Sequence, residues 1–218
     1  MKILLVTATK MEMDAIPVSL VEDDLNRKEI TVTRLVTSPG ILCTAYHMGK
    51  IFTASQFDFA INAGIAGSFN RNLELGSVIK IQREILADMG AEDGNELLSA
   101  FDINLFERDE FPFINGALLN ETSFPNSSLK NIPGVTGITV NTVHGNEESI
   151  GQIIRKYNPD VESMEGAAFF YACLLNQVPF CEVRAISNYV EKRDRSKWKI
   201  KLALDNLGFS VKKILLDF

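Results

Sequence analysis

The residues with the clearest chemical potential stand where apolar runs end. Glu12 follows the run "ILLV" at the expected start of a helix, and Glu165 holds a similar position in "VESMEGAAFF". A carboxylate at a helix N-terminus is stabilised as an anion, so each residue either complements the helix dipole or takes part in a reaction. As a reactive group, Glu12 would remove a proton. Glu165 would accept hydrogen bonds from two adjacent hydroxyls, such as a ribose diol.

The stretch "VRAISNYVE" places a cation inside an apolar run. Arg184 would be costly to bury alone, which predicts a carboxylate partner, either Glu12 or Glu165. Ser187 and Asn188 would project from the end of the same run. We therefore expect these polar groups to meet in one crevice at the carboxyl ends of the strands.

Three small or flexible residues flank these groups. Gly64 and Gly67 in "INAGIAGSF" would let backbone amides approach a ligand, or they would form a tight turn between a strand and a helix. Met164, beside Glu165, would cover the apolar face of a sugar or fill the core. The residues alone leave these alternatives open.

Length and charge limit the class of protein. The chain has 218 residues, 46% of them hydrophobic, which suffices for one domain spanning residues 1–218. The net charge of -6 argues against nucleic acid or an anionic membrane as partner. No run approaches the roughly 18 apolar residues of a membrane span, and the first residues resemble a strand more than a signal peptide.

The thiols and imidazoles give no sign of a metal site. Cys43, Cys173 and Cys181 lack ligand spacing and lie in apolar contexts, which predicts reduced core residues in a cytoplasmic protein. His47 and His144 have no second ligand at a suitable spacing. We therefore expect no metal site.

The apolar runs alternate with helical patterns. Residues 165–177 and the C-terminal stretch have helical periodicity, and short β-rich runs precede them. This alternation predicts an α/β fold with a mainly parallel central sheet. Residues 88–134 have little periodicity and form either a lid or interface segment or a surface excursion with short helices. The expected strands cover 2–8, 41–49, 57–64, 76–81, 137–143 and 179–187.

Several of these pieces together resemble the nucleoside phosphorylase and nucleosidase superfamily. The likeness is carried in order by "ATKMEMDAI", "INAGIAGS" and "VESMEGAAFF...VPFCEVRAISN", and is nearest to the methylthioadenosine/S-adenosylhomocysteine nucleosidase branch. It implies a three-layer fold with a mixed, mainly parallel sheet flanked by helices. It also implies a nucleosidase that acts on a small purine nucleoside without a cofactor, and a homo-oligomer.

The resemblance assigns roles to individual residues. Glu12 falls on the acid/base that deprotonates the attacking water, Met164 and Glu165 on the pair that holds the ribose, and Gly67 on a backbone contact to the ligand. Arg184 would orient a carboxylate or the water. Asn146 is placed among the substrate-binding residues, in the segment "VHGN" that with 88–134 would shape the pocket for the 5′ substituent.

Two positions depart from the family pattern. Ile65 replaces a small hydroxyl residue, which affects how water is held. Asn188 replaces the Asp that protonates purine N7 in the adenine-cleaving enzymes. An amide donates hydrogen bonds to the two acceptors of a 6-oxopurine, but it supplies no proton. The departure therefore favours hypoxanthine or guanine over adenine.

Further segments resemble the futalosine hydrolase family. They are "REILADMGAEDGNELLSAF", "DEFPFINGALLN" and "GVTGITVNTVHG". This resemblance implies hydrolysis of futalosine to hypoxanthine and dehypoxanthinylfutalosine in menaquinone biosynthesis. A phosphorylase using Lys10 and Arg71 as an anion site, an adenine-specific nucleosidase and a non-catalytic nucleoside-binding protein remain alternatives.

Overall fold

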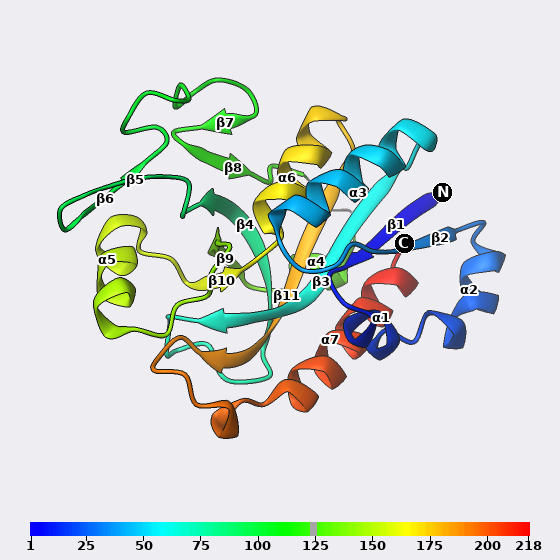
Figure 1. Cartoon of the computed structure of the whole chain (residues 1–218). Helices are drawn as coiled ribbons and strands as arrows, with labels where there is room; N and C mark the ends of the chain where they lie inside the picture. The colour runs from blue at the N-terminus through cyan, green and yellow to red at the C-terminus, as the bar shows by residue number, and fades with distance from the viewer. Residues whose placement is uncertain (123–125) are drawn as a thin grey trace.

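The centre of the molecule is a nine-stranded mixed sheet. The computed structural model describes residues 1–122 and 126–218. Along its main path the strands run in the order β2-β1-β3-β10-β9-β4-β8-β7, and β11 pairs with both β3 and β4 (Figure 1). The strands are β1 (Lys2–Thr7), β2 (Thr31–Val36), β3 (Phe59–Ser68), β4 (Val78–Leu86), β7 (Phe113–Ile114), β8 (Ala117–Leu119), β9 (Gly134–Thr139), β10 (Val161–Ser163) and β11 (Phe180–Tyr189).

Five of these strands close on themselves. β3 pairs with β11, β11 with β4, β4 with β9, β9 with β10, and β10 returns to the end of β3. Among the described residues, five pairings in this sheet are parallel and four are antiparallel. The predicted mixed α/β sheet is thus confirmed. The closure brings the ends of β3, β10 and β11 together.

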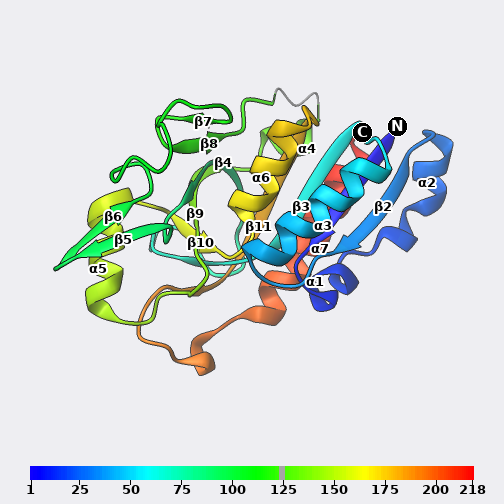
Figure 2. The ribbon, with the colours of Figure 1, turned by 45° about the horizontal axis from the view of Figure 1, so that its top comes forward.

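Helices cover both faces of the sheet (Figure 2). In β1, Ile3 and Leu5 join the apolar cluster under α7, while Leu4 and Val6 join the cluster under α3 and α6. This period of two is that of a strand buried on both faces. The helices are α1 (Lys10–Ala15), α2 (Glu22–Arg27), α3 (Ile41–Ala54), α4 (Ser127–Lys130), α5 (Glu147–Tyr157), α6 (Gly166–Leu175) and α7 (Ile200–Leu216), with the 3-10 turns η1 (Val18–Leu20) and η2 (Arg195–Lys197).

The strand predicted at 41–49 is wrong, because these residues form the first part of α3. Thr44 and Met48, four residues apart, are buried against the rest of the fold, as expected for one face of a helix. Packing on α6 therefore overrides the β propensity of the run. Cys43 is half-buried rather than in the core, whereas Cys173 and Cys181 are buried as predicted.

The segment 88–134 contains more regular structure than its sequence indicates. Its described residues form the hairpin β5 (Gly90–Asp93) and β6 (Glu96–Ser99), the hairpin of β7 and β8, and the short helix α4. β8 extends the large sheet by pairing with β4. Throughout the described residues, no helix combines the length and apolar character needed to cross a membrane.

Candidate active site

Glu12 is held where the first strand meets the first helix. Thr9 caps α1, and its backbone N and Oγ1 donate to Glu12 Oε2 at 2.9 and 2.7 Å. The other carboxylate oxygen, Oε1, accepts from the backbone N of Ile65 in β3 at 3.1 Å. Only 4% of Glu12 is exposed. Glu12 therefore completes the N-terminal cap of α1 and is also hydrogen-bonded to β3 in the candidate site.

Glu165 and Arg184 lie together beneath the start of α6. Glu165 is the N-cap residue of α6, and its Oε1 accepts from the backbone N of Gly40 at 3.0 Å. Its Oε2 is 3.7 Å from the Arg184 guanidinium. Arg184 is buried, and its Nε donates to Glu182 Oε1 at 2.8 Å. The predicted partner Glu165 is therefore present, but the shortest ion pair is with Glu182.

Gly64 allows Glu12 and Arg184 to approach the same point of β3. A Cβ atom at Gly64 would lie 2.1 Å from Arg184 Nη1 and 2.8 Å from Glu12 Oε1. Any side chain here would displace both groups. Burial alone would lower the pKa of Arg184, but the carboxylates of Glu182, Glu165 and Glu12 raise it above its ordinary value. The guanidinium therefore stays charged within a cluster of acids.

Two fully buried carboxyl groups support this cluster. A Cβ atom at Gly166 would lie 2.9 Å from Glu84 Oε2 and 3.0 Å from Glu182 Oε1, so the two groups face the same small space. Burial and then the charge of Glu182 raise the pKa of Glu84 well above its usual range. Thr139 Oγ1 donates to Glu84 Oε1 at 2.6 Å. Burial and the neighbouring charge therefore favour the protonated form of Glu84.

Replacing Glu84 with Gln is expected to stabilise the protein, increasingly so at higher pH. A carboxyl group whose pKa is raised by folding contributes stability below its unfolded pKa and loses it as pH rises towards the folded pKa. Glu84→Gln keeps the shape without titrating, so its stability relative to wild type should grow above about pH 4.5 and reach about 1–3 kcal/mol at pH 8. Urea unfolding at pH 5 and pH 8 measures this difference.

The exposed Glu92 of β5 provides the control for that comparison. Glu92→Gln should change stability by less than about 0.5 kcal/mol at both pH values. Equal effects of Glu84→Gln at pH 5 and pH 8 would show that Glu84 does not titrate abnormally.

A cavity at the ends of β3, β10 and β11 contains Asn188. A bulge in β11 between Ile186 and Asn188 brings Asn188 opposite Gly67, and bulges of this kind re-aim side chains near functional sites. The amide oxygen of Asn188 accepts from Ser187 Oγ at 2.8 Å, and Nδ2 donates one hydrogen bond to the backbone O of Tyr189 at 3.0 Å. The second N–H of this amide has no hydrogen-bond partner among the described residues, so it is left for a ligand.

The predicted residues divide between two places, because Glu12, Glu165 and Arg184 form the cluster described above and are not among the residues that line this cavity. Gly67 and Asn188 line the cavity, and half-buried Met164 lies between β10 and Glu165. The structure does not bring Asn146 to them. Asn146 is the exposed N-cap of α5, and its Oδ1 accepts from the backbone N atoms of the next helical turn at 2.9 and 3.3 Å. The cavity is lined by His144 from the same segment.

The sequence interpretation missed four residues that complete this region. Glu84 and Glu182 are the single carboxylates of the strands "VIKIQREIL" and "FCEVRAISNY", and an acid within a largely apolar run is the signal that would have identified them. His144 and Glu162 line the cavity with Asn188. Neither had a partner at a recognisable spacing, because their contact joins the end of β10 to the segment before α5.

Comparison with known proteins shows the superfamily to which the chain belongs. The model of the phosphorylase superfamily matches residues 31–216, and the chain belongs to this superfamily. Futalosine hydrolase of Streptomyces coelicolor is 29% identical over 230 residues, which cover 98% of this chain and 95% of the relative. A 5'-methylthioadenosine/S-adenosylhomocysteine nucleosidase of Colwellia psychrerythraea is 28% identical over 147 residues, which cover 63% of this chain and 58% of the relative.

Solved structures with a similar fold include proteins of the same kinds. A solved structure of a futalosine hydrolase mutant of Helicobacter pylori superposes with a TM-score of 0.77 at 17% identity, covering 100% of this chain and 99% of that chain. At this identity the likeness concerns the fold. Together the matches confirm the resemblance to the superfamily and to its nucleosidase members.

Proposed function

We propose that the protein hydrolyses the N-glycosidic bond of futalosine, releasing hypoxanthine and dehypoxanthinylfutalosine in menaquinone biosynthesis. Support comes from the near-complete alignment with the Streptomyces coelicolor futalosine hydrolase, which spans far more of the chain than the alignment with the adenosine-type nucleosidase. The alignment with the futalosine hydrolase therefore also includes the segments around the cluster of Glu12, Glu165 and Arg184.

The orientation of Asn188 is the observation that carries the base preference. Ser187 Oγ donates to the amide oxygen and Nδ2 uses one of its two N–H groups on Tyr189, so Asn188 offers the second N–H to the ligand. The edge of hypoxanthine presents two acceptors, O6 and N7, whereas adenine presents a donor beside N7. A donor in the protein matches the first pattern and leaves the 6-amino group of adenine unpaired. The amide thus stabilises the departing base by hydrogen bonding.

Glu12 is the general base of the proposed reaction. It takes a proton from the water that attacks C1′, while the glycosidic bond loosens towards an oxocarbenium-like state. Glu165 binds the ribose hydroxyls, with Met164 against the sugar and the Gly67 backbone against the ligand. Arg184 orients Glu165 from 3.7 Å away. No cofactor enters these steps.

Water rather than phosphate is the nucleophile in this proposal. The two cations that a phosphorylase would use are engaged elsewhere: Lys10 pairs with Asp14 at 2.5 Å, and Arg71 pairs with Glu191 at 2.6 Å. Both cations are well exposed. The charge of Glu12 would also repel a phosphate dianion.

Release of free base from different nucleosides tests the function. The purified protein is incubated with futalosine, inosine or methylthioadenosine, with and without phosphate, and the products are separated by chromatography. Hypoxanthine from futalosine, at a rate independent of phosphate, is the expected result. Adenine from methylthioadenosine would instead support the adenine-specific nucleosidase, and a requirement for phosphate would support a phosphorylase.

We also propose that the protein acts as a cytoplasmic homo-oligomer. Exposed apolar side chains on α3 and α6, including Leu42, Tyr46, Tyr171 and Leu175, support a subunit contact on this side. Solitary apolar residues are common on surfaces, but a cluster across two neighbouring helices is typical of an interface. Light scattering during gel filtration gives the mass in solution.

A further inference from the structure

His144 and Glu162 form a buried pair in the cavity that also contains Asn188. His144 Nδ1 lies 2.6 Å from Glu162 Oε2, and the backbone N of His144 donates to Glu162 Oε1 at 3.1 Å. The side chains are only 12% and 4% exposed. Two contacts from one carboxylate therefore fix both the backbone and the ring of His144.

The pair leaves one ring nitrogen of His144 available. A carboxylate only accepts hydrogen bonds, so Nδ1 carries a hydrogen, and Nε2 has no hydrogen-bond partner among the described residues. Glu162 orients the imidazole and carries the charge opposite to an imidazolium, as a carboxylate does in a catalytic triad. His144, which carries this free Nε2, lines the cavity.

The sheet places this pair and Asn188 on either side of Gly67. In the strand register, Gly67 is paired with Asn188 of β11 and with Glu162 of β10. A Cβ atom at Gly67 would lie 3.3 Å from Asn188 Nδ2 and 3.6 Å from Glu162 Cγ. Gly67 therefore separates two polar groups that leave little room for a side chain between them, and a base bound in the cavity that they line would meet both.

The proposed reaction needs a proton donor that Asn188 cannot be. When the C1′–N9 bond breaks, its electron pair passes to the purine, which leaves readily only if a ring atom gains a proton. An amide stabilises that charge but has no proton to give. Histidine is the side chain that most readily exchanges a proton near neutral pH.

We propose that His144, oriented by Glu162, donates a proton to the departing base. The inference rests on the proposed nucleosidase function. His144 transfers its Nε2 proton to the base and becomes neutral, while Glu12 removes a proton from the water whose oxygen binds C1′. Solvent then exchanges the proton from Glu12 and restores that of His144, so the net reaction is addition of water. Glu162 acts as a positioning residue.

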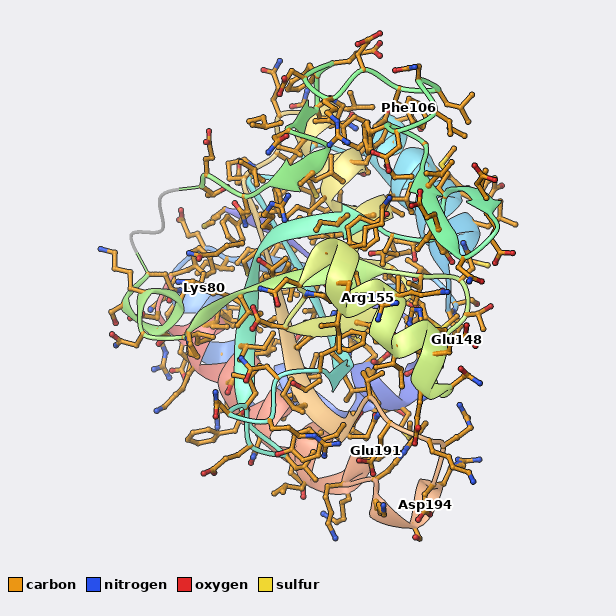
Figure 3. All side chains as sticks on the ribbon, turned by 90° about the vertical axis from the view of Figure 1, so that its left-hand side faces the viewer. Lys80, Phe106, Glu148, Arg155, Glu191 and Asp194 are labelled. Atoms are coloured by element: carbon orange, nitrogen blue, oxygen red, sulfur yellow. The ribbon has the colours of Figure 1, made fainter. Side chains whose placement is uncertain are left out.

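The other charged groups of the cavity are already engaged. Glu191 pairs with Arg71 at 2.6 Å and with Lys197 at 3.1 Å, and Figure 3 shows Glu191 in the segment after β11. Arg193 lies over the Trp198 ring at 5.0 Å. Glu162, Glu191 and Arg193 are thus the charged residues that line the cavity with His144.

Two substrates distinguish proton donation from a structural role. Futalosine has a leaving group that needs a proton, whereas 4-nitrophenyl β-ribofuranoside releases a stable anion. His144→Gln should lower kcat/KM for futalosine by about 10²- to 10⁴-fold and that for the nitrophenyl riboside by less than about threefold. Glu162→Gln should have the same selective effect, but a smaller one. The alkaline limb of the wild-type pH profile should disappear in His144→Gln.

The second histidine provides a matched control. His47 lies half-buried on α3, with its ring against Tyr46 at 5.3 Å, and His47→Gln should leave both rates within about twofold. Equal losses on both substrates in His144→Gln, or no loss on futalosine, would overturn the proposal. If the wild type cleaves inosine or methylthioadenosine instead, only the futalosine assignment fails, and the same comparison is made with that nucleoside. A wild type that cleaves none overturns both.

Discussion

Replacement of Glu12 by Gln is expected to lower kcat by about 10²- to 10⁴-fold, the usual contribution of a positioned general base. The amide cannot take a proton from water. It also meets N–H donors on both sides, from Thr9 and from Ile65, so one of these hydrogen bonds is lost. The helix cap should therefore weaken, at a cost of about 0.5–2 kcal/mol in stability. Single-turnover kinetics with saturating nucleoside measure the chemical step separately from binding.

The expected pattern separates an enzyme from a binding protein. Nucleoside affinity, measured by calorimetry, should change by less than about tenfold while turnover nearly vanishes. Glu22, exposed in the first turn of α2, is the matched control, and Glu22→Gln should leave kcat within about twofold. Retention of full turnover in Glu12→Gln would exclude Glu12 as the base, and absence of turnover in the wild type would favour a nucleoside-binding protein.

The fold was predictable where a pattern is local. β1, β3, β4 and β11 and helices α6 and α7 lie where apolar runs and helical periodicity place them. Residues 41–49 were misassigned because the burial that selects a helix there comes from α6, more than a hundred residues away. The closure of β3, β11, β4, β9 and β10 was also invisible, since pairing between distant strands leaves no local pattern.

The candidate site likewise contains residues that the sequence could identify and contacts that it could not. Glu12, Glu165 and Arg184 could be found because each interrupts an apolar run or begins a helix, and their contacts are now explicit. Glu182 was missed as the nearest partner of Arg184, although it lies only two residues away in the same strand. Residues two positions apart in a strand point to the same face. The alternation of side chains along the strand could therefore have predicted this pair. The contact between His144 and Glu162 depends on tertiary packing.

Arg184 should be the residue on which the stability of the cluster depends most. Its replacement by Met leaves Glu182 and Glu165 buried without their cation, which typically costs about 3–5 kcal/mol. Burial already raises the pKa of Glu182, and Arg184 opposes this shift. Without Arg184 the pKa rises further, so the loss should be largest at neutral and alkaline pH and shrink as acid neutralises Glu182.

A double-mutant cycle isolates the ion pair from the packing of the side chain. Arg184→Met combined with Glu182→Gln should recover part of the loss, because the second change removes the uncompensated charge. Arg155, exposed on α5 and labelled in Figure 3, is the control, and Arg155→Met should shift the free energy of unfolding by less than about 0.5 kcal/mol. Urea unfolding at pH 5.5 and pH 8 measures the four proteins of the cycle and the control. A loss for Arg184→Met below about 1 kcal/mol, or one independent of pH, would mean that the buried acids are neutral in the wild type. The guanidinium would then serve Glu12 and Glu165 in catalysis rather than holding the fold together.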